Sequence, residues 1–463
     1  MNRFAPIGLA ALATLTIAAC SDDDDHVAAE AVLRIFHASP DAPAVNVWLD
    51  GSPALEGVDY QASSGQIRVA AGSHTVQIDA ILADDSTLTV LPETTLDLAE
   101  NMEYNVLAMG RAAEIGSGND TEFGPQIVAR DYLMPEGARV QAIHASPDAP
   151  TVDVFITAPG ADLSGEMPFA DDLAYTMASD AVEVPAGDYQ IRITDMSDSS
   201  IVYFDSGTVS VPAGGDWVAA AVTNTDAGGS PVSLVVDTGA ASLVVQSADS
   251  TANLRVVHTI SDAPGVDIWV YGTAPDASSP LFNLMFKEFT DYLALDVGMS
   301  YDFAVGVNGS DPLVVVDALG LSDVMLDANT SYSAIAIGNL GDMLDNDETY
   351  VVVDANTRRV ATEAKVRAIH ASALAGNVDI YISEDATPSM DDIILEGVAY
   401  KGDSTVLSIT PGARYVMVTP AGDDSVIAIG PVEFPFAGNT LTTIIALDDP
   451  MSATGVSAIS IDD

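Results

Sequence analysis

Histidine and aspartate recur at fixed places along this sequence and are the first candidates for chemistry. Four of the six histidines stand in one repeated phrase, which reads His-Ala-Ser-Pro-Asp-Ala-Pro at its first two occurrences. They are His37, His144, His258 and His370, and the phrase also supplies Asp41, Asp148 and Asp262. Imidazole and carboxylate groups act as metal ligands and general bases, so a metal or catalytic site would be sought here first.

We interpret the four histidines as structural. Strand parity places Leu33, Ile35 and His37 on the core side of one strand. A buried ring N–H just before a turn can donate to a backbone carbonyl and fix that turn. The functional alternative, a metal ligand or general base, lacks a second histidine at ligand spacing.

The repeated aspartates have two interpretations. Aspartate between prolines caps a turn by accepting backbone N–H bonds, while the prolines fix φ. A calcium ligand is the alternative, because cell-surface sandwich modules often bind Ca²⁺, but calcium needs several oxygen ligands that converge. We favour turn capping and expect no cofactor, with calcium kept as the alternative.

A second repeated set lies on the opposite parity of the following strand. Each strand there carries an amide or carboxylate and then an aromatic residue: Asn46 and Trp48, Asp153 and Phe155, Asp267 and Trp269, Asp379 and Tyr381. The outward side of the first strand carries Arg34, Gln141, Arg255 and Arg367. The simpler interpretation is a cross-strand ion pair. The alternative is an exposed ligand surface formed by Trp48, Phe155, Trp269 and Tyr381, as in sugar-binding sandwiches.

The N-terminal segment resembles an export signal with an anchor. Arg3 precedes a short apolar stretch that ends Ile17-Ala18-Ala19-Cys20. That ending is similar to the lipobox of bacterial lipoproteins, which implies that Cys20 becomes the first mature residue and carries acyl groups such as palmitate. Ser21 then implies the outer membrane. Residues 21–30 include four consecutive aspartates and are expected to form an acidic tether.

The elements that position these residues repeat with the period of a whole domain. The four histidines are 107, 114 and 112 residues apart. Period-two alternation, β-branched residues and frequent turn signals predict strands, and only 166–178 and 281–295 have room for a short helix. We predict an all-β chain of four tandem antiparallel β-sandwich modules, Ig-like or transthyretin-like, at 31–132, 133–248, 249–361 and 362–463. Short linkers suggest a semi-rigid rod.

Composition narrows the partners. The chain has 15 basic and 68 acidic residues and a formal net charge of -53, so binding to nucleic acid is not expected. Cys20 is the one cysteine, so an intramolecular disulfide is excluded.

The repeated openings, LRIFHASPDAPAVNVWL and VQAIHASPDAPTVDVFI among them, resemble the bacterial domain of unknown function 4397. The third copy departs from the motif at Thr259-Ile260-Ser261, and the fourth has lost both prolines and the aspartate and reads Ala373-Leu374-Ala375-Gly376 after Ser372. The resemblance implies an exported protein without an assigned activity. Loss of the motif from the fourth copy argues against a site that needs the whole loop in each module.

Sequence motifs for a nucleophile elbow, a phosphate-binding loop or a zinc protease are absent. We therefore expect a non-enzymatic surface lipoprotein of the outer membrane. It would be held to the membrane by its lipid anchor, with an adhesion, binding or spacer role toward a surface polysaccharide or protein. The alternative is a carbohydrate- or ligand-binding surface protein, possibly calcium-dependent.

Overall fold

The computed structural model describes residues 29–271, 280–309, 322–339 and 349–463. Cys20 and the predicted leader and tether up to residue 28 lie outside the described residues. Within them the regular structure is strands and short 3-10 turns, so the all-β prediction is confirmed. The segments 166–178 and 281–295 contain strands rather than a helix.

The strands form eight sheets of four or five strands, arranged as two per module, and this confirms the prediction of tandem β-sandwiches. Module 1 contains β1 (Glu30–Ala38), β2 (Val45–Leu49), β3 (Ser52–Val58), β4 (Ile67–Ala70), β5 (Gly72–Ile81), β6 (Thr87–Leu98), β7 (Met102–Met109), η1 (Ala112–Glu114) and β8 (Gly124–Asp131). Module 2 contains β9 (Ala138–His144), β10 (Val152–Thr157), β11 (Ala170–Leu173), β12 (Val182–Val184), β13 (Gly187–Asp195), β14 (Asp198–Val211), β15 (Asp216–Thr223), β16 (Val232–Asp237) and β17 (Ser242–Val245).

Modules 3 and 4 repeat the plan. Module 3 contains β18 (Ala252–His258), β19 (Val266–Tyr271), β20 (Phe282–Leu284), β21 (Leu293–Leu295), β22 (Ser300–Val307), β23 (Val324–Met325), β24 (Ser331–Ala336) and β25 (Thr349–Val353). Module 4 contains β26 (Ala364–His370), β27 (Val378–Ser383), η4 (Met390–Asp392), β28 (Ile393–Val398), β29 (Leu407–Ile409), β30 (Gly412–Pro420), β31 (Ile429–Phe436), β32 (Thr440–Asp448) and β33 (Val456–Asp462).

Each module has a first sheet, which contains its first strand, and a second sheet. In module 1 the orders are β4-β1-β7-β8 and β3-β2-β5-β6. The first sheet differs from the antiparallel expectation in one place, because β1 pairs with β7 in parallel, and β9–β15, β18–β24 and β26–β32 do the same. Between β1 and β7 the chain adds β2, β3, β5 and β6 to the second sheet and the antiparallel strand β4 to the first, and this long crossover lets β7 run in the same direction as β1.

The core of each module lies between its two sheets. In module 1 it includes Leu33 and Ile35 from β1, Val47 from β2 and Ile78 from β5. This placement agrees with the predicted core parity of β1. Burial of such side chains on both inner faces is what holds a sandwich together.

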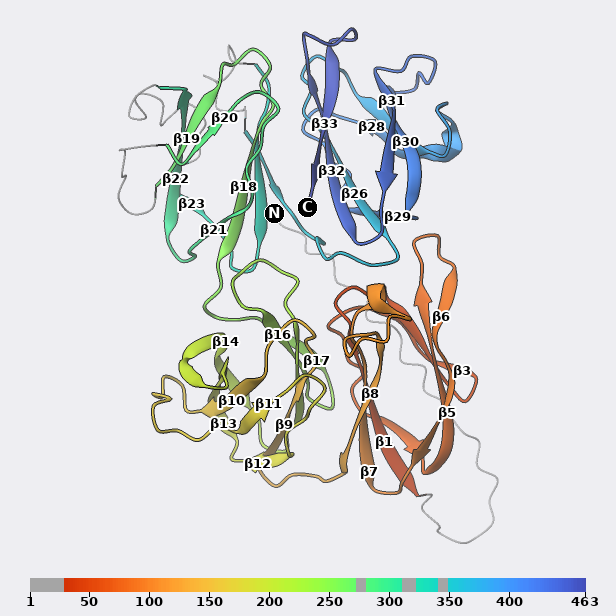
Figure 1. Cartoon of the computed structure of the whole chain (residues 1–463), viewed down its shortest axis with the longest axis vertical. Helices are drawn as coiled ribbons and strands as arrows, with labels where there is room; N and C mark the ends of the chain where they lie inside the picture. Colours follow the sequence, from red (N-terminus) through yellow and green to blue (C-terminus); the bar gives the residue numbers. More distant parts are fainter. Residues whose placement is uncertain (1–28, 272–279, 310–321, 340–348) are drawn as a thin grey trace.

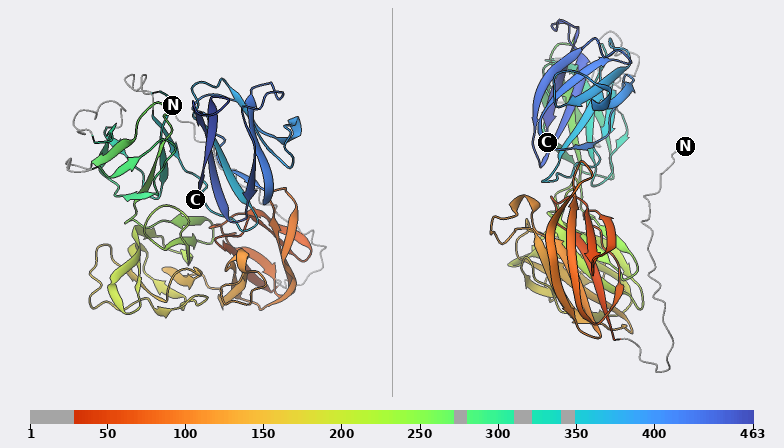
Figure 2. Two further views of the ribbon diagram at one scale, coloured as in Figure 1. Left: turned by 45° about the horizontal axis from the view of Figure 1, so that its top comes forward. Right: turned by 90° about the vertical axis from the view of Figure 1, so that its right-hand side faces the viewer.

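The modules do not form a rod. Modules 1 and 2 lie side by side in one tier, and modules 3 and 4 lie side by side in a second tier (Figures 1 and 2). The first sheets face one another within each pair, so strands such as β9 and β26 are buried along their whole length. Short linkers limit the distance between modules, but they do not prevent a fold-back, and the apolar outer faces favour one.

Apolar side chains fill both interfaces between paired modules. Between modules 1 and 2 they are Phe36, Ala38, Tyr60, Leu107, Met109, Ile143, Ala145, Val218, Ala220, Val222 and Val235. Between modules 3 and 4 they are Val257, Ile335, Ile337, Val352, Ile369, Ala371, Ile445 and Ile461. We call these the 1–2 interface and the 3–4 interface.

Candidate functional site

The repeated histidines are buried, and each ring faces the turn that follows it. Nε2 lies 2.9 Å from the Pro43 carbonyl oxygen in His37 and 2.9 Å from that of Pro150 in His144. The corresponding distances are 3.3 Å from His258 to Pro264 and 3.0 Å from His370 to Gly376. A carbonyl oxygen can only accept, so Nε2 carries the proton and donates it.

This geometry suits neutral, structural histidines. Burial lowers the pKa of His37 to about 4, and it also lowers the pKa values of His144 and His258. Each ring also meets an aromatic ring edge-on, from Tyr60, Tyr175, Phe286 and Tyr400 in turn. Nε2 is bound to a carbonyl oxygen in all four modules, so this nitrogen is occupied within the turn in each of them.

The repeated aspartates do not converge on a common point. Asp41 accepts backbone N–H bonds at 2.7 and 3.0 Å from Ala112 and Ala113, at the start of η1. It therefore caps a neighbouring loop rather than its own turn. Asp148 pairs with Arg111 and accepts from the Thr223 hydroxyl at 2.9 Å. Asp262 is exposed.

In module 4, which lacks the turn aspartate, a different residue supplies a carboxylate. Asp448, the last residue of β32, accepts from the Ser372 hydroxyl and, at 3.2 Å each, from the N–H groups of Ala373 and Leu374. In both modules a carboxylate links the turn to the segment that it faces. In module 1 the carboxylate belongs to the turn residue Asp41, whereas in module 4 it belongs to Asp448 at the end of the strand.

The four aromatic residues proposed as an exposed ligand surface are not exposed. Phe155, Trp269 and Tyr381 have 3, 3 and 1% of their surface accessible, and Trp48 is half-buried. The exposed-surface interpretation is therefore wrong for three of the four. Period-two parity assigns a residue to the outer face of its own sheet but does not show what covers that face.

The polar residues beside them fix the adjoining strand. Asn46 accepts from the N–H of Gly57 at 2.9 Å, Asp153 from that of Asp172 at 2.9 Å, and Asp379 from that of Gly397 at 2.6 Å. Each donor residue has a positive φ, of 64°, 50° and 65° respectively. The side chains therefore fix an irregular point of the adjoining strand, where the backbone is in the left-handed region.

The arginines on the first strands bind carboxylates of the facing module in addition to groups of their own module. Arg34 is fully buried in the 1–2 interface, with Nη2 2.8 Å from Asp216 and Nη1 3.1 Å from Asp237, both in module 2. Its Nε lies 3.1 Å from Glu103 of its own module. Arg34 thus pairs across strands with Glu103 of β7 rather than with the polar residue of the second strand, and it also bridges the two modules, which sequence spacing alone does not reveal.

Asp216 is the centre of this network. Arg130 and Arg139 also reach it, at 3.0 and 2.8 Å. Burial alone would raise the pKa of Asp216, but the hydrogen bond from Arg139 and the charges of Arg130 and Arg34 outweigh it and lower that pKa. We call Arg34, Arg130, Arg139, Glu103, Asp216 and Asp237 the 1–2 charge network.

The 3–4 interface has a similar arrangement. Arg255 of module 3 pairs with Asp463 of module 4. In the other direction, Arg367 of module 4 lies 2.6 Å from Asp354, which directly follows β25. Gln141, the equivalent residue of module 2, instead donates to the Ser179 carbonyl at 2.9 Å.

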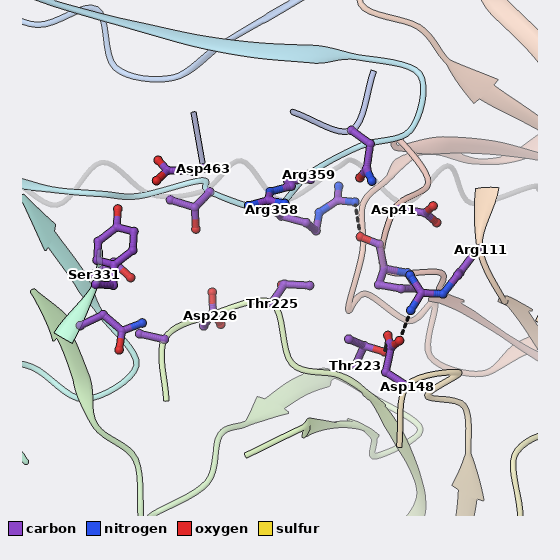
Figure 3. Close-up of a pocket in the computed structure, with 16 residues that line it drawn as sticks. Asp41, Arg111, Asp148, Thr223, Thr225, Asp226, Ser331, Arg358, Arg359 and Asp463 are labelled. Carbon is purple, nitrogen blue, oxygen red and sulfur yellow. Dashed lines mark hydrogen bonds and ion pairs between the residues drawn. The ribbon is translucent and has the colours of Figure 1, made fainter. Parts of the chain in front are cut away.

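A polar cavity of about 400 Å³ lies where the four modules meet (Figure 3). The turns of modules 1 and 2 contribute Asp41 and Asp148, and the segment that connects modules 3 and 4 contributes Arg358 and Arg359. Arg358 donates to the carbonyl oxygens of Ala42 at 2.7 Å and Pro40 at 3.3 Å, and so ties the two tiers together. The sequence analysis did not predict this cavity. The adjacent residues Arg358 and Arg359, in a chain with few basic residues, could have indicated a polar site.

The lining of this cavity combines arginine, aspartate and hydroxyl groups, which can bind a polar molecule. The remaining lining residues are Arg111, Thr223, Thr225, Asp226, Ala227, Asn253, Tyr292, Ser331, Thr357, Asn439, Asp463 and Pro40. The lining includes no histidine or cysteine. Burial raises the pKa of Asp226, and it raises that of Asp463 despite the adjacent Arg255.

One acidic cluster has spacing compatible with a cation. Carboxylate oxygens of Asp153, Asp171 and Asp172 lie within 4.8 Å of one another. Calcium takes about 6–8 oxygen ligands, so three carboxylates do not by themselves define a calcium site. The turn aspartates on which the calcium alternative was based are not part of this cluster.

The fold and its repeated turn define a protein of tandem, structurally equivalent β-sandwich modules. A profile of the family described as Domain of unknown function (DUF4397) matches residues 31–155, 138–244 and 252–381. The chain belongs to this family. No curated protein matches the chain. Among the described residues, no helix has the length and apolar character needed to cross a bilayer.

Proposed function

We propose that this chain is a non-enzymatic lipoprotein of the cell envelope that presents a rigid, acidic four-module block for binding, adhesion or spacing at the outer membrane. The observation that carries the proposal is the use of the repeated polar groups. Histidine Nε2 atoms are bound to carbonyls, and Arg34, Arg255 and Arg367 are bound to carboxylates of facing modules. These repeated residues therefore hold the turns and the modules together, and this supports a non-catalytic role for them.

The anchor is the part of the proposal that rests on sequence. The segment Ile17-Ala18-Ala19-Cys20 has the form of a lipobox, and Cys20 is the one cysteine in the chain. Acylation needs a thiol at this position, and an acyl chain together with a second attachment gives stable membrane binding.

Expression of the full chain in a Gram-negative host tests the anchor. We expect the wild-type protein in the outer-membrane fraction, with the mass of its N-terminal peptide raised by acyl groups. Cys20→Ser should be absent from that fraction, whereas Ser21→Ala, a matched control beside it, should keep the acyl groups. An unmodified wild-type Cys20, or a Cys20→Ser protein that fractionates as the wild type does, would overturn the proposal.

A second candidate is capture of a small polar ligand, such as a sugar, in the cavity where the modules meet. Its size of about 400 Å³ and its mixture of arginine, aspartate and hydroxyl groups favour such a ligand. The test is calorimetry with a panel of neutral and acidic sugars. Heat of binding that is lost in Arg359→Ala supports it, and the absence of binding to the whole panel rejects it.

A further inference from the structure

Module 4 contains a second large cavity, of different character. It has a volume of about 400 Å³ and lies between the two sheets of the sandwich. Valine, isoleucine and alanine dominate the lining, with Val366, Ile380 and Ile444 among them. The core is correspondingly divided, because the buried residues around Phe436 and those around Val378 form two separate clusters.

The equivalent spaces in modules 1 and 2 are almost closed. The cavities there measure about 10 and 20 Å³. In module 1, Phe123 from the connection between β7 and β8 packs against the core. The shorter connection between β32 and β33 presents Ser452, Ala453 and Thr454 at the cavity instead.

Strand register identifies a second cause. Phe204 of β14 pairs with Ile193 in module 2, and it is 1% exposed in the core. The corresponding pair in module 4 is Ile429 with Val418, both of which line the cavity. Both side chains of this pair are smaller in module 4, so the space that Phe204 occupies in module 2 is left open.

The cavity opens toward solvent at Ala453 and Thr454, which are exposed, so its apolar lining faces water when no ligand is bound, and apolar surface left in contact with water costs free energy in proportion to its area. The volume lies within the range of about 300–1,000 Å³ that is usual for small-molecule sites. An apolar lining excludes tightly held water, because water needs polar partners. A ligand that replaces water with aliphatic contacts would remove the cost.

The lining also defines the ligand. It contains no charged side chain, and its hydroxyls, from Ser452, Thr454 and Ser457, come from the β32–β33 connection and the adjoining part of β33. The net charge of -53 disfavours an anionic head group. We propose that module 4 binds an uncharged aliphatic molecule, of the class of a linear alcohol or ester, with its chain between the sheets and its polar end toward these hydroxyls. This site is independent of the anchor and of the polar cavity.

Binding of 1-decanol to the full chain tests the proposal, with decanoate as the charged counterpart. The readouts are the melting temperature and displacement of the neutral fluorophore N-phenyl-1-naphthylamine. We expect one 1-decanol per chain, a rise in melting temperature, and binding of decanoate at least about tenfold weaker.

Two substitutions should close the site. Ile429→Phe introduces the residue type that module 2 has at this position, and Ala446→Leu fills the cavity from β32. Each is expected to weaken 1-decanol binding at least about tenfold without lowering the melting temperature of the ligand-free protein. The matched control is Leu91→Phe, because Leu91 pairs with Ile78 in module 1 as Ile429 pairs with Val418.

Leu91→Phe should leave 1-decanol binding unchanged. The proposal is overturned if wild-type protein does not bind 1-decanol, or if both module 4 variants bind it as tightly as wild type. If one variant fails to fold, the other still decides the outcome. Equal affinity for decanoate would reject the uncharged class of ligand while leaving the cavity as the site.

Discussion

The buried turn histidine His37 links the stability of the protein to pH. The folded-state pKa of His37 is about 4, below its ordinary value of 6.5, because burial disfavours the charged ring. As pH falls from about 6.5 toward 4, the unfolded chain takes up a proton that folded His37 does not. The contribution of His37 to the free energy of unfolding is therefore fully present above pH 6.5 and is lost as the pH falls toward 4, by up to about 3 kcal/mol.

We expect the unfolding free energy from urea titrations to fall between pH 7 and pH 5, and to fall less steeply in His37→Gln. His74 provides the control, because Asp50 raises its pKa and gives it the opposite sign. His74→Gln should steepen the loss. An equal slope in wild type and His37→Gln would contradict this account of the buried ring.

The 1–2 charge network offers a second prediction for single residues. Asp216→Asn should leave three buried arginines short of a negative charge, and breaking a buried network in this way costs about 3–5 kcal/mol. Glu30→Gln removes a charge from the exposed pair with Arg68 and should cost less than about 1 kcal/mol. Equal losses in urea unfolding would show that burial of the network does not matter.

At the scale of elements, the sequence allowed the strands and the core face to be predicted, but not the pairing of modules. Alternation placed Leu33 and Ile35 inward, as found. The opposite face of β1 was interpreted as outward, although Phe36 and Ala38 on that face are apolar. An apolar residue on both faces is typical of a strand covered on both sides, and this signal was available.

The candidate sites were less predictable. The two module 2 carboxylates that bind Arg34 lie more than 180 residues along the chain, so no local spacing could identify them. The cavity in module 4 arises from side-chain volumes at paired positions, such as Ile429 and Val418, and the pairing must be known before these volumes can be compared. The turn histidines were predictable because their partners lie six residues away.

A residue on the face of the first sheet that packs against the sister module should lose as much stability on truncation as a residue inside a sandwich core. Leu107 is fully buried in the 1–2 interface, and Leu107→Ala is expected to cost about 2–5 kcal/mol. Ile127, on the neighbouring strand β8, is 41% exposed, and Ile127→Ala should change stability by no more than about 1 kcal/mol. Urea unfolding of the two variants measures both values, and a Leu107→Ala loss as small as that of Ile127→Ala would mean that modules 1 and 2 separate in solution.

For the whole molecule, the two-tier arrangement (Figure 2) predicts a compact particle. A compact chain of this length has a radius of gyration of about 22 Å, and the four-module block should lie within a few ångströms of that value. Small-angle scattering at about 0.15 M salt provides the measurement. A radius near twice this value would indicate modules arranged end to end and would contradict the tie between tiers made by Arg358.

Because each first sheet is covered by the first sheet of a sister module, no module is self-sufficient. A chain cut after its third module would leave Val257, Ile335 and Ile337 facing water and would remove Asp463, the module 4 partner of Arg255. Such a fragment should aggregate, or form a dimer through this surface, unlike one cut after the second. Gene duplication or deletion would therefore preserve folding only when it adds or removes a pair of modules. Stably folded relatives with this architecture should contain even numbers of modules.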